Sequence, residues 1–277
     1  MNLNETTRVG LGVTQALRLR VSVASLVRLL YKNPGDGDWT LALERKATLN
    51  ETVSGNVVKV KAQPFGGVVR IRDISALHEL IGDFHFDSEA SRSEGDFRIF
   101  IRPTTWRALR SVCIEHLSRE RDSLLESDPR RELIEELYDA LSITLNPTQY
   151  ASKPIATIAE DFPSPSKNPR ARGYQTVRIY RIYEGLIKDT NLALMLGKNS
   201  EGLSDQDLRD RALRDLELGG KGRANAILAM PLRTITDHYL GLSPDERNQP
   251  VLYEGHRLDE TVPAVLEEIT VPKYVRL

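Results

Sequence analysis

The 277-residue sequence predicts a mixed α/β protein. Strand-like and helix-like patterns follow one another irregularly along the chain, unlike the strict β–α–β–α alternation of a doubly wound sheet. The composition, 40% hydrophobic and 28% charged, is that of a globular protein. The length suits one large domain, or one core with a substantial extension.

The predicted strands are runs rich in Val, Leu and Ile. Residues 20–31 (RVSVASLVRLLY) are mostly apolar, which is typical of a strand covered on both faces. A turn of Asn, Pro, Gly and Asp follows, so residues 39–47 are predicted to complete a hairpin. Residues 57–71 form a strand broken at Pro64 and at Gly66–Gly67, where adjacent glycines indicate a bulge or a close backbone approach. Further strands are predicted at 97–103, 176–187 and 226–232.

Helical periodicity is present in five segments, which are 74–82, 104–127, 131–145, 204–218 and 234–242. Asp128 and Pro129 suit the start of the third helix, as cap and first-turn residue. Residues 85–96 and the proline-rich segment 159–175 are predicted to be loops, and long ordered loops are often functional.

Charge and cysteine content limit the class of partner and compartment. The net charge of −1 gives no overall attraction to nucleic acid or to an anionic membrane, so neither is expected as a partner. The single cysteine, Cys113, cannot form an internal disulfide or a CxxC zinc motif. No signal peptide or apolar run of about 18 residues is recognisable, so a cytoplasmic location is expected. The sequence leaves open whether the protein forms a homodimer.

The segment DPRRELIEEL, residues 128–137, concentrates carboxylates on one helix face. At about 100° per residue, Glu132, Glu135 and Glu136 fall within an arc of roughly 100°, and Arg131 is placed to pair with Glu135. Clustered carboxylates repel unless they are solvated, paired with Arg or neutralised by a cation. Mg²⁺ uses such carboxylates together with water and phosphate oxygens. A solvated helix face explains the same pattern, so the residues alone leave both interpretations open.

Arg131–Glu136, RELIEE, resembles the REUxEE core of the Nudix box, in which U is aliphatic. The preceding QPFGGVV resembles the glycine-containing strand that comes before this helix in Nudix hydrolases. The full pattern, GX5EX7REUXEEXGU, is not kept, because Leu117, Ser123 and Tyr138 stand at its first glycine, first glutamate and last glycine. The distance from Gly67 to Arg131 also implies a large insertion, at about 72–118, before the helix.

The layout is similar to that of the SMODS-associated Nudix domains. The segments that carry this resemblance are Gln63–Val69, Glu94–Phe100, Arg119–Glu120 and Arg131–Leu137. The resemblance covers roughly residues 18–241 and implies a Nudix-like α/β/α sandwich with a mixed sheet. Residues 1–17 would then be an N-terminal arm, and 242–277 a C-terminal extension packed on the same domain.

The resemblance implies hydrolysis of a nucleoside diphosphate-linked substrate, and members of the group accompany bacterial defence systems that use nucleotide second messengers. The expected partner is therefore a nucleotide-derived small molecule. By that resemblance Mg²⁺, or alternatively Mn²⁺, is held by Glu132, Glu135 and Glu136, with Arg131 orienting the carboxylates. The expected substrate-binding residues are Gly66, Gly67, Arg170 and Arg172, since paired arginines can clamp a diphosphate.

Several alternatives remain at this point. The altered box positions suit a catalytically degenerate domain that senses a nucleotide, and a structural or protein-interaction role stays open as well. The general base is open between Glu136, Glu160 and Asp161. Cys113 and His116 lie one helical turn apart, a spacing more typical of core packing than of a catalytic dyad.

Overall fold

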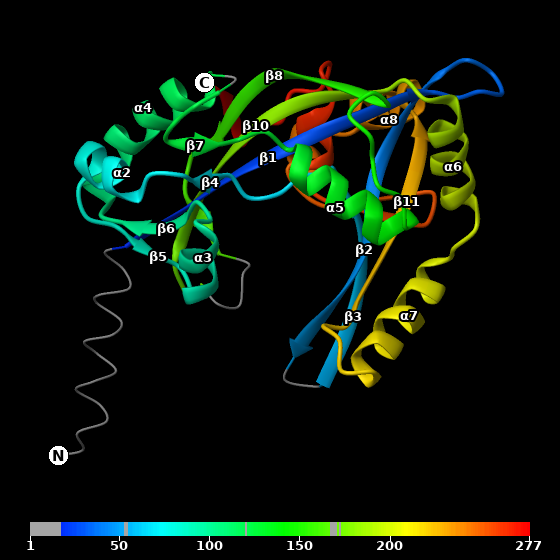
Figure 1. The fold of residues 1–277 in the computed structure, drawn as a ribbon, viewed down its shortest axis with the longest axis horizontal. Coiled ribbons are helices and arrows are strands. Elements are labelled where there is room, and N and C mark those ends of the chain that lie inside the picture. The colour runs from blue at the N-terminus through cyan, green and yellow to red at the C-terminus, as the bar shows by residue number, and fades with distance from the viewer. Residues whose placement is uncertain (1–17, 53–54, 120, 167–170, 172) are drawn as a thin grey trace.

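A computed structural model describes residues 18–52, 55–119, 121–166, 171 and 173–277. It has a curled mixed sheet with helices on both faces (Figure 1), which confirms the predicted mixed α/β fold class. Among the described helices, none combines the length and apolar character needed to cross a membrane.

The sheet is built from six long strands. These are β1 (Leu19–Lys32), β2 (Trp39–Thr52), β3 (Gly55–Gln63), β8 (Tyr150–Glu160), β10 (Gln175–Ile187) and β11 (Arg223–Pro231). The shorter strands are β4 (Arg70–Ile71), β5 (His85–Phe86), β6 (Arg98–Ile101), β7 (Leu125–Glu126), β9 (Ser164–Pro165), β12 (Val251–Tyr253), β13 (His256–Leu258) and β14 (Tyr274–Arg276). The order along the main sheet is β12-β13-β3-β2-β1-β10-β8-β14, β11 pairs with β2, and β4 and β7 form a separate two-stranded sheet. The sheet is mixed because β1 runs parallel to β10 and antiparallel to β2.

One edge of β1 changes partner along its length, and this change sets the position of the glycine pair. Residues 19–22 of β1 pair with β6, and residues 29–32 pair with β2. Between them the chain at 65–69 lies against β1, where the Ser25 amide donates to the Gly67 carbonyl at 2.8 Å. The Val27 amide donates to the Phe65 carbonyl at 2.7 Å. The glycine pair therefore lies where the sheet divides between β6 and β2.

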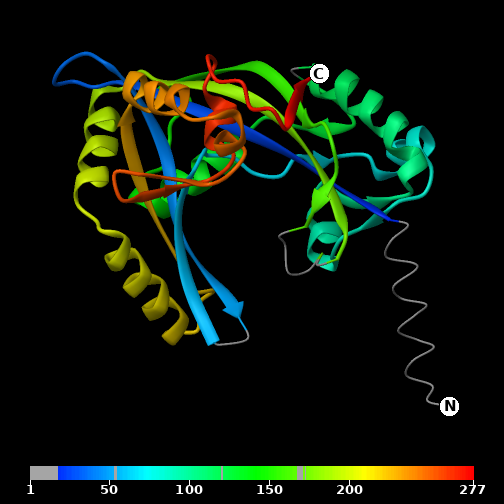
Figure 2. The ribbon, with the colours of Figure 1, turned by 180° about the vertical axis from the view of Figure 1, so that it is seen from behind.

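The helices form two layers around the sheet. They are α2 (Ile74–Ile81), α3 (Glu89–Glu94), α4 (Trp106–Leu117), α5 (Arg130–Leu141), α6 (Thr190–Glu201), α7 (Asp205–Glu217), α8 (Leu232–Gly241) and α9 (Pro244–Arg247), with 3-10 turns at Pro103–Thr105 and Val262–Val265. Helices α5 and α6 pack on one face of the sheet. Helix α8 and the C-terminal segment cover the other face, which is turned toward the viewer in Figure 2.

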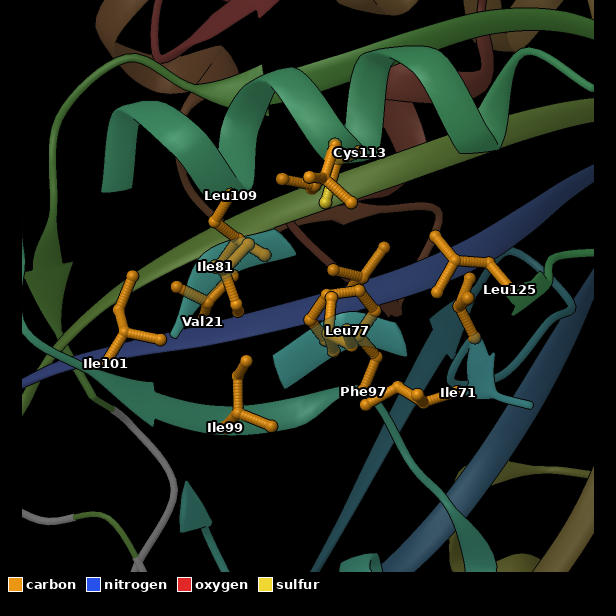
Figure 3. Packing of buried hydrophobic residues seen from close by; sticks show 14 of the residues in the cluster. Val21, Ile71, Leu77, Ile81, Phe97, Ile99, Ile101, Leu109, Cys113 and Leu125 are labelled. Carbon is orange, nitrogen blue, oxygen red and sulfur yellow. The ribbon is translucent and has the colours of Figure 1, made fainter. Parts of the chain in front are cut away.

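A separate hydrophobic cluster fills the lobe built by residues 71–125. Helices α2 and α4 face β6 and the first half of β1 there, with Leu77, Ile99 and Leu109 fully buried (Figure 3). The segment between the glycine pair and the acidic helix therefore packs on the main sheet through an apolar cluster that it shares with β1 and β10.

The structure corrects several element predictions. Residues 85–96 are not a loop, because β5 pairs with β6 and α3 is capped by the Ser88 hydroxyl and ended by left-handed Gly95. The helix predicted over 104–127 ends at Leu117, after which the Asp122 carboxylate accepts the amides of Leu124 and Leu125 at 2.8 Å. Helix α5 ends at Leu141 rather than near 145, because Ser142 adopts a left-handed conformation with φ 56.

Two long elements lie in segments for which the sequence patterns predict none. Strand β8 occupies residues 150–160, so the loop predicted over 159–175 begins later, and its residues 164–165 pair with β10 as β9. Helix α6 occupies residues 190–201 and is capped by Asp189, whose carboxylate accepts the Leu192 amide.

Candidate acidic site beside the glycine pair

Burial of one face of α5 determines which carboxylates turn inward. Leu133 and Leu137 are buried in the core formed with Val27 and Phe65. Because side chains three and four residues apart share a helix face, Glu132 and Glu136 lie beside this apolar stripe and next to the glycine pair. The helix begins after Pro129, and the Asp128 carboxylate accepts the Arg130 amide at 2.9 Å.

Glu136 is the most deeply placed carboxylate of the helix, with 8% of its surface exposed. Its Oε2 atom accepts the Gly66 backbone N–H at 2.8 Å. Burial and the nearby carboxylate of Glu44 raise the pKa of Glu136 well above its ordinary value, and the Gly66 N–H opposes this effect. The metal-free site therefore favours a proton on Glu136.

Glu44 on β2 is the partner that the sequence patterns did not single out. It is fully buried, accepts the Gln63 side-chain amide at 2.9 Å and pairs with the Lys46 ammonium at 3.1 Å. The signal available in the sequence was a carboxylate in the middle of the apolar run WTLALERKA, where a charge needs a partner.

Glu132 lies directly against Gly67. A Cβ atom built on Gly67 would stand 2.3 Å from Cδ of Glu132, so any other residue there would displace the Glu132 side chain. Burial raises the pKa of Glu132, while its ion pair with Arg131 acts in the opposite direction. Gly66 has φ 133, and a Cβ atom there would be 2.1 Å from the Ser25 carbonyl oxygen, so the backbone at this position requires glycine.

The remaining predicted site residues are less enclosed. Glu135 is paired with Arg131 at 3.3 Å and its side chain is 58% exposed, so it lies outside the carboxylates that meet the glycine pair. Arg131 thus links Glu132 and Glu135. The other two predicted substrate-binding residues, Arg170 and Arg172, lie outside the described residues.

The other candidate groups from the sequence are placed as follows. Glu160 on β8 pairs with Arg178 at 2.8 Å, and Asp161 is exposed. Cys113 is buried and burial raises the pKa of its thiol to about 12, which leaves it a poor nucleophile at neutral pH. The His116 ring lies 2.9 Å from the Asp122 carboxylate.

The donor set beside the glycine pair suits a hard divalent cation. Glu44, Glu132 and Glu136 supply carboxylate oxygens, the ligands that Mg²⁺ and Mn²⁺ prefer, and burial raises the pKa values of Glu132 and Glu136. Within the described part of the chain, no three His, Cys, Asp or Glu side chains stand close enough together to hold a metal ion in their present positions. A cation there would complete its shell with water or substrate oxygens.

A cavity of about 530 Å³ opens beside these carboxylates. Gly66 and Gln63 line it, and the same two residues donate hydrogen bonds to Glu136 and Glu44. Its other walls include Lys59 and Lys61 of β3, Arg178 and Tyr180 of β10, and the segment Arg257–Thr261.

A helix that presents glutamates to a glycine-containing strand beside a curled mixed sheet is the arrangement of a Nudix-type domain. The model of the SMODS-associated NUDIX domain matches residues 51–200, more than half of the chain. The protein belongs to this SMODS-associated NUDIX domain family.

No curated protein matches the chain significantly. Among solved structures, a chain of the "Structure of T. brucei MERS1-RNA complex" is similar at 7% sequence identity and a TM-score of 0.23. The similarity covers 86% of this chain and 60% of that chain, so the protein spans less than two thirds of its length.

Proposed function

We propose that this protein is a divalent-metal-dependent hydrolase that cleaves the phosphoanhydride bond of a nucleoside diphosphate-linked substrate. The observation that supports this most strongly is the pair of buried carboxylates, Glu44 and Glu136, each held by a residue that also lines the adjoining cavity. Two buried carboxylates in proximity disfavour double ionisation unless positive charge is supplied.

Each side chain has a role in this proposal. Glu132 and Glu136, with Glu44, would hold Mg²⁺ or Mn²⁺, and Arg131 positions Glu132 through their ion pair. Glu135 steadies Arg131 and, because its side chain is exposed, can turn toward the same cation. When bound, the metal would polarise the phosphoryl oxygens and activate water. Arg170 and Arg172 remain proposed phosphate ligands, and a cytoplasmic role in bacterial antiviral defence is proposed from the family resemblance.

The test is a screen of nucleoside diphosphate-linked compounds with and without Mg²⁺, in which product formation is measured. Glu136→Gln and Glu44→Gln should each lower kcat by about 100-fold or more, since losing a charged group at a metal site removes several kcal/mol of transition-state stabilisation. Asp139→Asn, on the same helix, is the matched control and should retain turnover. Unchanged Mg²⁺-dependent turnover in both glutamine variants would refute the proposal.

A second candidate function is nucleotide sensing without turnover. It is favoured by Leu117 and Ser123, which stand where the Nudix box has a glycine and a glutamate. A nucleotide that raises the melting temperature while no product forms over hours would support this function instead, because ligand binding alone stabilises the native state.

A further inference from the structure

The cavity beside the glycine pair has two chemically different parts. At its mouth, Lys59 and Arg257 are exposed and form no ion pair with another described residue. Deeper in, oxygen-bearing side chains gather, namely Tyr180, Asp259, Glu260 and Thr261. Cations in this position suit phosphate, whereas carboxylates and hydroxyls suit the hydroxyl groups of a sugar.

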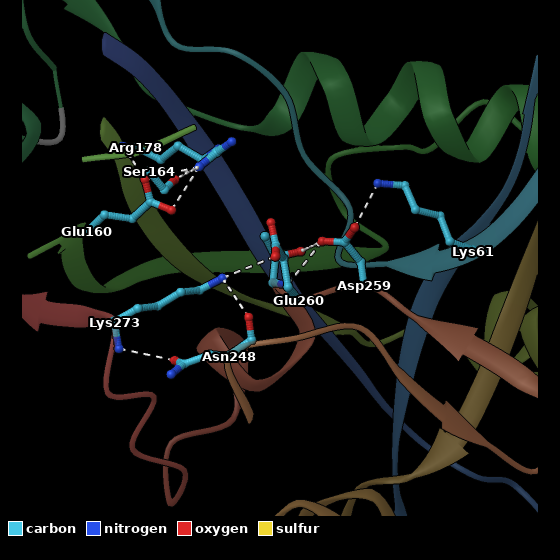
Figure 4. Close-up of polar contacts among 9 residues, drawn as sticks. Lys61, Glu160, Ser164, Arg178, Asn248, Asp259, Glu260 and Lys273 are labelled. Atoms are coloured by element: carbon cyan, nitrogen blue, oxygen red, sulfur yellow. Dashed lines mark hydrogen bonds and ion pairs between the residues drawn. The ribbon is translucent and has the colours of Figure 1, made fainter. Parts of the chain in front are cut away.

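The inner part is fixed by a network of ion pairs. The Asp259 carboxylate accepts hydrogen bonds from the Lys61 ammonium at 2.7 Å and from the Thr261 hydroxyl at 2.7 Å. Glu260 pairs with Lys273 at 3.4 Å, and on the opposite wall Arg178 is held by Glu160 at 2.8 Å (Figure 4). These side chains are therefore positioned before any ligand arrives, which lowers the entropy cost of binding.

Tyr180 adds a phenol group to the wall of the cavity. Its ring is buried, and the residue lines the cavity between Arg178 and the Asp259–Glu260 segment. Burial raises the pKa of the Tyr180 phenol, so the hydroxyl stays protonated at neutral pH and can donate a hydrogen bond. A buried aromatic ring with an available hydroxyl is a common recognition element for sugars and bases.

We propose that this cavity binds the nucleoside half of the substrate, with its sugar hydroxyls at Tyr180, Glu260 and Thr261 and a phosphate at Lys59 and Arg257. The substrate class, a nucleoside diphosphate-linked compound, rests on the proposed function. The volume of about 530 Å³ is in the range of small-molecule sites and accommodates a nucleotide. Because Gln63 and Gly66 line the cavity and also donate hydrogen bonds to Glu44 and Glu136, a ligand seated here lies beside these two carboxylates.

The assignment gives the C-terminal segment a direct part in recognition. Arg257, Asp259, Glu260 and Thr261 all follow residue 241, and they lie outside residues 51–200, the stretch matched by the family model. Strand β13 brings them to the cavity by pairing with β3 at Leu258 and Ala62. Ligand choice would therefore depend on a part of the chain that lies beyond the matched stretch.

The test is calorimetric titration of ADP-ribose, UDP-glucose and inorganic pyrophosphate in Mg²⁺-free buffer, where binding is measured without turnover. The double variant Lys59→Met/Arg257→Met should weaken binding of a nucleotide probe by 10-fold or more. Tyr180→Phe should weaken the nucleotide probe by about 5-fold, the effect of one lost hydrogen bond, and leave pyrophosphate unchanged. Lys188→Met/Arg233→Met, which removes two exposed cations elsewhere, is the matched control and should bind like wild type.

The outcomes separate this inference from the proposed function. Binding that depends on Tyr180 and on the cation pair, without turnover of any compound, supports the cavity and contradicts the hydrolase. If a compound is turned over and its KM is unchanged by Lys59→Met/Arg257→Met and by Tyr180→Phe, the hydrolase is supported and the cavity assignment is overturned. The assignment is also overturned if neither nucleotide probe binds at millimolar concentration, or if pyrophosphate binds as tightly as the nucleotides.

Discussion

The two adjacent glycines have different neighbours, which predicts different effects of adding a methyl group. In Gly66→Ala the new Cβ meets the Ser25 backbone oxygen at a positive φ, so the backbone must move and several kcal/mol of stability should be lost. In Gly67→Ala the new Cβ meets the flexible Glu132 side chain, which can move aside. We expect Gly67→Ala to fold with a melting temperature near wild type but to lose most Mg²⁺-dependent turnover. Equal melting temperatures for the two variants would contradict this account.

The buried carboxylate of Glu136 predicts a pH dependence of stability. Its pKa is raised in the folded state, so the folded protein holds the proton more tightly than the unfolded chain. Stability should therefore fall as pH rises from about 4.5, the ordinary value, through the raised pKa of the folded state, and then level off. The groups that face Glu136 are Glu44 and Lys46 of β2, Glu132 of its own helix and the Gly66 N–H.

Glu136→Gln should remove this fall and raise the metal-free stability at pH 8 by about 1 kcal/mol, because an unpaired buried charge is replaced by a neutral group. Urea denaturation at several pH values in EDTA measures the effect, with exposed Glu135→Gln as the control. Mg²⁺ should stabilise the wild type more than Glu136→Gln, and increasingly so at higher pH. A wild-type stability that rises over this pH window would count against a buried, metal-seeking Glu136.

At the scale of single residues, local motifs predict only part of the candidate site. Glu132, Glu136 and the glycine pair follow from RELIEE and QPFGGVV, because spacing along one helix and one strand is local information. Glu44, Gln63 and Tyr180 do not, since their proximity arises from the pairing of β2 with β3 and from the folding of β10 alongside them. No local pattern encodes such distant pairing.

Among the elements, α5 must dock firmly for its carboxylates to meet the glycine pair. Leu137 is buried in the core it shares with Val27 and Phe65, whereas the next residue, Tyr138, is 56% exposed. Leu137→Ala should lower the free energy of unfolding by about 2–5 kcal/mol, and Tyr138→Ala by less than about 1 kcal/mol. Chemical denaturation distinguishes the two values. If Tyr138→Ala lowers the free energy of unfolding as much as Leu137→Ala does, the assigned orientation of α5 about its own axis is wrong.

The elements that the sequence patterns revealed are those with a clear period or turn signal. Strands β1 and β10 have long Val- and Ile-rich runs, and α7 carries a capping box at Ser204. Strand β8 was missed because YASKPIATIAE contains Pro154 and little apolar alternation, and a register shift at Ile182/Tyr183 accommodates the proline. Helix α6 was missed because Asn, Gly and Ser in TNLALMLGKNSE weaken its helical signal.

Across the whole molecule, β1 joins cores that would otherwise be separate. Val21 belongs to the cluster beneath α2 and α4, Leu29 to the cluster beneath α5, and Leu30 to the cluster covered by α8 and the C-terminal segment. Strand β14 pairs with β8, and β13 pairs with β3, so residues after 241 are part of the main sheet. We infer that residues 18–241 and 242–277 fold as one unit.

This arrangement predicts that a defect in the C-terminal core destabilises the entire domain. Leu266 is buried against β1 and β2 residues in the shared core, whereas Leu252 is 71% exposed. Leu266→Ala should cost about 2–5 kcal/mol and Leu252→Ala less than about 1 kcal/mol. In Leu266→Ala, hydrogen exchange should accelerate in β1 and β10 as well as in the C-terminal segment, since a single cooperative unit opens together. Faster exchange confined to residues after 241 would show instead that the extension unfolds on its own, and the cavity wall it supplies would then be a separable part of the site.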